Sequence, residues 1–200
     1  TLIEQEVINL LGEAAGQSKA IAAITSKAMS GELNFKEALK QRVAYLAGLD
    51  HSVLNQVRER ITLTKGAKTL IDVLHEHGHR VGVISGGFIE VIEPILQSLK
   101  IDFYKANKLK VENGKLTGEI DPPIIDSHAK LVALKEFADL EKVSLDQAVA
   151  IGDGANDLEM IRAAGLGIAF NAKPKVAAAA DTTISHHDLS TVLLLMGISI

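Results

Sequence analysis

Helix-like and strand-like patterns alternate along the chain from Ala67 onward. Ala67, Leu70, Ile71 and Leu74 have the i, i+3, i+4, i+7 spacing of an amphipathic helix, and Gly78 follows as a stop signal. Short apolar runs then predict buried strands over residues 80–85, 147–151, 167–170 and 181–184. The intervening patterns predict helices over residues 88–99, 128–140 and 173–180. This order indicates parallel βαβ units and an α/β fold with a doubly wound parallel sheet.

The first of these later helices contains Pro94, which we expect to kink or reset it, because proline has no N–H to donate. The second can be capped by Asp126 or Ser127, both good N-cap residues. In the predicted sheet, ligands bind outside the carboxyl ends of the strands. Polar residues that follow strands are therefore the first candidates for a site.

Two segments interrupt the alternation. Residues 6–63 have helical patterns with no strand between them, and Phe35, Leu39, Val43 and Leu46 fall on one helix face. Residues 107–120 contain Asn-Gly between two β-like runs, a strong hairpin signal. We therefore expect an α/β core over residues 1–5 and 64–200, a helical cap insertion over 6–63 above the strand ends, and a small β-hairpin.

Composition adds few constraints to this picture. With 47% hydrophobic and 23% charged residues in 200, the chain can bury a sizeable core. The net charge of −4 gives no general attraction to nucleic acid or to an anionic membrane, and no run approaches the ~18 apolar residues of a membrane span. The absence of cysteine excludes disulfides and thiolate metal sites, and we expect a cytoplasmic protein. We interpret His75, His77 and His79 as loop histidines in preference to a metal cluster.

The stretch IGDGAND places polar residues where a predicted strand becomes a helix. Asp153 at the strand end can ligate a hard cation such as Mg²⁺, with Asn156 and Asp157 holding its surroundings. A simple helix N-cap is the alternative, but it needs fewer polar residues. A dinucleotide fingerprint would require glycine where Asp157 stands, and an EF-hand would require glycine and an acid where Leu158 and Ala164 stand.

The stretch VISGGF and a downstream lysine supply two further candidates. Ser85 and the two glycines after it can offer a hydroxyl and free N–H groups to an anion, although a plain turn is an equal alternative. The spacing is not G-x-S-x-G, which argues against an acyl-transfer nucleophile. Lys130 falls in the first turn of its helix, where a positive charge is unfavourable unless an anion lies nearby. It is otherwise an ordinary surface lysine.

VISGGF, Lys130 and IGDGANDLEM, in that order, resemble the second, third and fourth motifs of haloacid-dehalogenase superfamily phosphatases. The helical insertion, with SGELNFKEALKQRV, is similar to that of members that hydrolyse O-phospho-L-serine to serine and phosphate, the last step of serine biosynthesis. The resemblance implies that a phosphoryl group passes to an aspartate of a D-x-D-x-T motif and then to water. It also implies a Mg²⁺ cofactor and a small phosphomonoester substrate.

The resemblance assigns a role to each matching residue. It implies that Asp153 is a direct Mg²⁺ ligand, with Asp157 orienting the metal shell and Lys130. Catalytic and substrate-binding roles fall as follows: Ser85, Gly86 and Lys130 on the phosphate, Asn156 on the phosphate or substrate, Glu6 on the substrate ammonium, and Arg42 on its carboxylate. The fork of an arginine suits a carboxylate well. Without the resemblance, Glu6 and Arg42 are ordinary surface positions.

Thr1 aligns with the threonine of D-x-D-x-T, so the nucleophilic and general-acid aspartates, and the strand before them, are expected just upstream of Thr1. We expect that residues preceding Thr1 carry them. Two alternatives stay open: phosphoryl chemistry on another small phosphomonoester, including transfer to an alcohol such as homoserine, and a non-catalytic phosphate-binding module. The sequence also leaves open a homodimer and an N-terminal regulatory domain.

Overall fold

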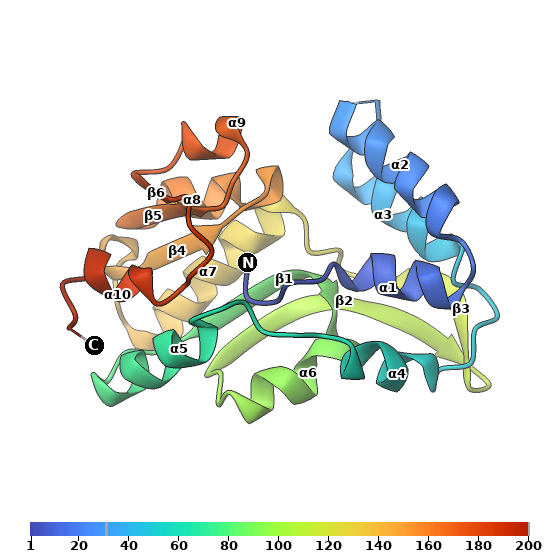
Figure 1. Cartoon of the computed structure of the whole chain (residues 1–200), viewed down its shortest axis with the longest axis horizontal. Helices are drawn as coiled ribbons and strands as arrows, with labels where there is room; N and C mark the ends of the chain where they lie inside the picture. The colour runs from blue at the N-terminus through green and yellow to red at the C-terminus, as the bar shows by residue number, and fades with distance from the viewer. Residues whose placement is uncertain (31, 200) are drawn as a thin grey trace.

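The structure, a computed structural model, describes residues 1–30 and 32–199, without the side chains of residues 29 and 30. In these ranges five helices come first, and strands and helices then alternate, except that β3 follows β2 directly (Figure 1). In chain order the elements are α1 (Val7–Ala14), α2 (Ser18–Ser30), α3 (Phe35–Ala44), α4 (Val53–Glu59), α5 (Ala67–Glu76), β1 (Gly82–Phe88), α6 (Ile89–Ser98), β2 (Phe103–Glu112), β3 (Lys115–Asp121), α7 (Ser127–Glu141), η1 (Leu145–Gln147), β4 (Val149–Gly152), η2 (Ala155–Asp157), α8 (Leu158–Ala163), β5 (Leu166–Phe170), α9 (Pro174–Ala177), β6 (Thr182–Ile184) and α10 (Thr191–Leu195). No helix in the described ranges is long and apolar enough to cross a membrane.

The strands form two three-stranded sheets, ordered β1-β2-β3 and β4-β5-β6. The pairs β1/β2, β4/β5 and β5/β6 are parallel, each joined through a helix, which confirms the α/β class and the predicted βαβ units. β2 and β3 pair antiparallel, as the hairpin signal predicts. Asn113 and Gly114 at the turn have φ values of 50° and 74°, the left-handed pair that a tight hairpin turn requires. The hairpin is an extension of β2, since β2 also pairs with β1.

Several predicted elements differ from those observed. The strand predicted over 147–151 is β4, which spans Val149–Gly152, because Gln147 ends η1. The strand predicted to end at Ser85 continues to Phe88, although its register with β2 shifts between these two residues. The helix predicted over 173–180 spans only Pro174–Ala177. The helix around Pro94 is not reset there, because α6 runs continuously from Ile89 to Ser98.

The N-terminal helices surround one end of the β1–β3 sheet. α2 and α3 lie side by side and project from the rest of the molecule, while α1 and α4 lie along the sheet (Figure 1). α3 begins with a capping box, in which the Asn34 side chain accepts the Glu37 N–H at 2.9 Å and the Glu37 carboxylate accepts the Asn34 N–H at 3.4 Å. One hydrophobic cluster joins these helices to the sheet and α6; its members include Leu11, Leu39, Val43, Val57, Phe88, Val91, Leu96 and Leu109.

Arg58 of α4 compensates for the proline in α6. Pro94 cannot donate to the carbonyl of Glu90, one helical turn earlier. The Arg58 guanidinium donates there instead, from Nη2 to the Glu90 oxygen at 2.8 Å and from Nε to the Val91 oxygen at 3.2 Å. This contact explains how the helix continues through Pro94, and it fastens the end of the helical segment to the core.

We expect Arg58→Ala to lower the free energy of unfolding by about 1–3 kcal/mol, because it leaves part-buried carbonyls without a donor. In a Pro94→Ala background, the new N–H can serve the Glu90 carbonyl, and the same substitution should cost less. Urea unfolding of the four proteins measures this coupling. Arg60→Ala, which removes an exposed pair with Glu13, is the control and should change stability by less than about 1 kcal/mol. An identical cost of Arg58→Ala in both backgrounds would contradict the assignment.

Candidate active site

The loop after β4 folds around the carboxylate of Asp157. The Oδ2 atom of Asp157 accepts the N–H groups of Asp153 at 3.1 Å and Gly154 at 3.0 Å. Gly152 makes this approach feasible, because a Cβ at that position would lie 2.4 Å from the Asp157 Cβ and 2.6 Å from its Cγ. The side chain of Asp157 is therefore turned back into its own loop, and the glycine before Asp153 has no room for a side chain.

Lys130 and Asp157 form a buried ion pair. The Lys130 Nζ atom donates to Asp157 Oδ1 at 2.5 Å, and the two side chains are only 7% and 6% exposed. Asp126 caps α7 by accepting the Ala129 N–H at 2.9 Å, and this places Lys130 in the first turn of the helix. The anion that would offset a lysine at a helix N-terminus is thus supplied by Asp157. Lys130 is not the surface lysine that the sequence left as an alternative.

Asp153 remains the exposed carboxylate of the loop. Half of its side chain is accessible, and Oδ1 lies 2.9 Å from the amino nitrogen of Thr1 and accepts the Thr1 hydroxyl. Burial raises the pKa of Asp153, whereas the Thr1 hydroxyl and the Lys130 ammonium lower it. With half of its side chain exposed, Asp153 is the carboxylate of this loop that a ligand can reach.

The bulge near the end of β1, over Ser85–Gly87, lies beside this loop. The Ser85 Oγ atom accepts the Gly87 N–H at 2.9 Å, and the Gly86 carbonyl accepts the Asn107 amide at 2.8 Å. A Cβ on Gly86 would lie 3.7 Å from the amide nitrogen of Asn156. The two polar stretches predicted to meet at the strand ends are therefore in contact through Gly86 and Asn156.

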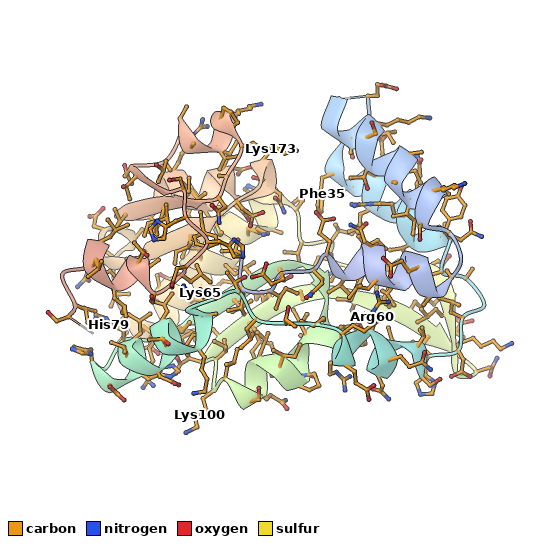
Figure 2. The ribbon with its side chains drawn as sticks, in the orientation of Figure 1. Phe35, Arg60, Lys65, His79, Lys100 and Lys173 are labelled. Carbon is orange, nitrogen blue, oxygen red and sulfur yellow. The ribbon has the colours of Figure 1, made fainter. Side chains whose placement is uncertain are left out.

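The first turn of α3 reaches the same region. A Cβ on Gly86 would lie 3.3 Å from the Phe35 ring, and Lys36 Nζ lies 2.8 Å from Asp126 Oδ2 at the start of α7. Figure 2 shows Phe35 on the side of the α2–α3 hairpin that faces the C-terminal half of the chain. The sequence prediction missed this residue as a site candidate, because its spacing with Leu39 and Val43 indicated only a core position. The available signal was its position in the first turn of a cap helix predicted to lie above the strand ends.

Arg42 and Glu6 lie near each other in the helical segment. Arg42 donates from Nε to the Ala38 carbonyl at 3.2 Å and from Nη1 to the Thr25 hydroxyl at 3.4 Å. Burial lowers the pKa of Arg42, and the nearby Glu6 carboxylate partly offsets this, so the guanidinium stays charged. Glu6 is exposed at the N-cap of α1. The structure thus holds a part-buried cation and an exposed anion on neighbouring helices.

The histidine stretch lies elsewhere. His75 contacts Asp102 at 3.0 Å, and the His77 ring contacts the Val73 carbonyl at 2.9 Å. Within residues 1–30 and 32–199, no three or more His, Cys, Asp or Glu side chains are grouped to hold a metal ion.

Comparison with known proteins identifies the family of this chain. The chain matches the haloacid dehalogenase-like hydrolase family over residues 1–162. It therefore belongs to that family. More narrowly, it is 50% identical over 193 residues to a phosphoserine phosphatase of Lactococcus lactis subsp. lactis (strain IL1403), a match covering 96% of this chain and 89% of the relative.

A second relative and a solved structure are also described as phosphoserine phosphatases. Phosphoserine phosphatase SerB2 of Mycobacterium tuberculosis (strain ATCC 25618 / H37Rv) is 49% identical over 199 residues, and the match covers 100% of this chain but 49% of that protein. The chain thus spans about half the length of this relative. A solved structure described as a phospho-aspartyl intermediate analogue of phosphoserine phosphatase has a TM-score of 0.92 and 39% identity, covering 100% of this chain and 94% of that one.

We expect Lys130→Met to lower the free energy of unfolding by about 3–5 kcal/mol, because it leaves the Asp157 carboxylate buried without a partner. Combining it with Asp157→Asn removes the unpaired charge, so the double variant should be more stable than the sum of the single costs predicts. Urea unfolding of the four proteins tests this. Lys68→Met breaks the exposed Lys68–Asp72 pair and should cost no more than about 0.5 kcal/mol. Additive costs at Lys130 and Asp157 would contradict the pairing.

Proposed function

We propose that this protein is a Mg²⁺-dependent phosphatase that hydrolyses O-phospho-L-serine to L-serine and phosphate. The observation that carries the proposal is the buried Lys130–Asp157 pair beside the exposed Asp153, at strand ends that Gly86 and Asn156 bring together. Such a site offers a cation and free polar groups to a phosphate and a carboxylate to a metal ion. The names of the relatives supply the substrate.

The residues present fit a magnesium ion. Mg²⁺ in phosphate-processing sites uses one or two protein carboxylates, and water and substrate phosphate fill its other positions. Asp157 has both oxygens engaged, by Lys130 and by its own loop, whereas Asp153 is half exposed. Asp153 would therefore hold the ion, and Asp157 would orient the loop and Lys130. Bound there, the cation would neutralise negative charge on the phosphate.

The phosphate would lie between the end of β1 and α7. Ser85, the backbone of Gly86, Lys130 and Asn156 are the groups that we assign to its oxygens. Fixed N–H, hydroxyl and ammonium donors stabilise the charge of a transferring phosphoryl group without reorganising during the reaction. The Lys130 ammonium is already oriented by Asp157, so it can take this position at little entropic cost.

Arg42 and Glu6 would recognise the amino-acid part of the substrate. The planar guanidinium of Arg42 can pair with the substrate carboxylate, and the Glu6 carboxylate can accept the substrate ammonium. Glu6 lies close enough to Arg42 to raise its pKa, and this supports assigning the two residues to the two charged groups on one α-carbon. Phe35, against Gly86, would cover the phosphate end and exclude water.

Covalent catalysis requires a nucleophile, which the family resemblance places before Thr1. In the proposed reaction an aspartate oxygen there bonds to phosphorus and the P–O bond to serine breaks. The second aspartate of the motif gives the serine oxygen its proton, and then takes a proton from the water that releases phosphate. Thr1 contacts the Asp153 carboxylate, so a residue bonded to the Thr1 nitrogen would lie close to Asp153 at the strand ends.

We also propose that residues 1–5 and 64–200 form the core and that 6–63 form a cap. Two connections support the boundaries. Ile3 and Leu63 form an antiparallel bridge. The Gln5 side chain donates to the Thr62 hydroxyl and accepts the Thr62 N–H, both at 2.9 Å. The two linkers to the helical segment thus run together. A cytoplasmic location and a homodimer stay predictions.

We expect the full-length protein to release phosphate from O-phospho-L-serine with Mg²⁺ and to stop in excess EDTA. Asp153→Asn should lower kcat by more than about 100-fold, because it removes the proposed ligand charge. Asp72→Asn, an exposed helix residue, is the control and should leave the rate unchanged. Malachite-green detection of released phosphate measures the wild-type protein, with Mg²⁺ and with EDTA, and both variants.

An unchanged rate in EDTA would contradict the metal requirement. Turnover of other phosphomonoesters but not phosphoserine would contradict the substrate, and would favour a related phosphatase or a phosphotransferase. No phosphate release from any phosphomonoester would contradict catalysis and favour the phosphate-binding module.

We expect Arg42→Ala to raise KM for O-phospho-L-serine about 10–100-fold, because a charge-assisted pair with the substrate carboxylate is lost. With p-nitrophenyl phosphate, which has no carboxylate, KM should change less than about three-fold, since no pair is made. Arg60→Ala, at the exposed end of α4, is the matched control (Figure 2). Equal losses on both substrates would show that Arg42 does not recognise the carboxylate.

A further inference from the structure

Asn107 is a fully buried polar residue that none of the roles above includes. It lies on β2, and its exposed fraction is 0%. The other buried polar or charged side chains of the described residues are Thr64, Lys130 and Asp157, and the last two form the ion pair of the candidate site. A buried amide must have its hydrogen bonds satisfied, so its partners reveal what it does.

One partner is the Ser85–Gly87 bulge of β1. The register between β1 and β2 pairs Ser85 with Ala106 and then Phe88 with Asn107, so Gly86 and Gly87 are extra residues without strand partners. The Asn107 amide donates from Nδ2 to the Gly86 carbonyl at 2.8 Å and supplies the bond that the sheet does not. The orientation of the Gly86 peptide therefore depends on this side chain.

The other partner is the segment that leads into α7. The Asn107 Oδ1 atom accepts the N–H of Ile125 at 2.8 Å, and Ile125 is itself buried. The next residue is Asp126, the N-cap that accepts the Ala129 N–H and fixes the first turn containing Lys130. Because one partner is a carbonyl and the other an N–H, only this orientation of the amide satisfies both.

We propose that Asn107 is a positioning residue, which holds the Ser85–Gly87 bulge of β1 at a fixed separation from the N-terminus of α7. The inference rests on the proposed function, in which these two elements carry Ser85, Gly86 and Lys130 to one phosphate. An apolar side chain at position 107 would leave two buried backbone groups unpaired, and each element would shift to recover a partner. Misplacing catalytic groups by about 1 Å can cost 100-fold in rate.

The test compares Asn107→Leu, which is similar in size but makes neither bond, with Leu109→Ala. Leu109 is a core residue of the same strand and is 2% exposed. Its side chain takes no part in the two hydrogen bonds of Asn107. Both variants are assayed well below their melting temperatures, with circular dichroism to verify folding. The readouts are kcat/KM on a phosphomonoester, inhibition by inorganic phosphate, and amide hydrogen exchange at Gly87 and Ala129.

We expect Asn107→Leu to lower kcat/KM about 10–100-fold, to weaken phosphate inhibition in parallel, and to speed exchange at both amides. Leu109→Ala, even with an equal loss of melting temperature, should keep kcat/KM within about three-fold and leave both amides protected. A folded Asn107→Leu protein with near wild-type kcat/KM and protection would overturn the proposal. Equal kinetic losses in both variants would overturn it too.

A second variant and a second readout keep the test decisive. If Asn107→Leu does not fold, Asn107→Ala removes both hydrogen bonds with a smaller side chain, and faster exchange is expected at both Gly87 and Ala129. Unchanged protection of both amides would overturn the proposal. If the wild-type protein releases no phosphate, the proposed function fails, and hydrogen exchange alone decides whether Asn107 positions the two elements.

Discussion

The arrangement of the strand ends depends on one buried ion pair, between Lys130 and Asp157. A charge removed from water is costly unless it is paired and hydrogen-bonded, and here the pairing is complete: one Asp157 oxygen takes the Lys130 ammonium and the other takes two loop N–H groups. Moving either residue would leave an unpaired charge. The pair therefore fixes α7 against the loop after β4, and it leaves Asp153 as the carboxylate free to face a ligand.

Around this pair, two elements distant in sequence contribute further contacts to the site. Gly86 presents its carbonyl to Asn107 and its open face to Phe35 and Asn156. Lys36 of α3 reaches the N-cap Asp126, whose pKa is lowered by that ammonium and by the Ala129 N–H. The helical segment is thus joined to the same helix start that holds Lys130. A phosphate at this place would be surrounded by groups whose positions are set before it binds.

The sequence predicted those features that depend on local pattern. The helix beginning at Ala67, the hairpin at Asn113–Gly114 and the cap at Asp126 all follow from spacing or from backbone preferences of single residues, and the structure confirms them. The extra residues at Gly86 and Gly87 were not predicted, because a register shift depends on the partner strand. The continuity of α6 through Pro94 was missed for the same reason: its compensating donor, Arg58, lies on another helix.

The sequence by itself determined the α/β class, the order of the elements and the residue types at the strand ends, since these depend on periodicity and on motifs read in one stretch. Only the tertiary structure decided how those residues are paired and which carboxylate stays exposed. Lys130 and Asp157 are as polar as Asp153, yet folding buries the first two against each other and leaves the third accessible. It likewise made Asn107 a buried link between two elements. Burial and pairing are properties of the packed chain, because they depend on neighbours that the folding brings together.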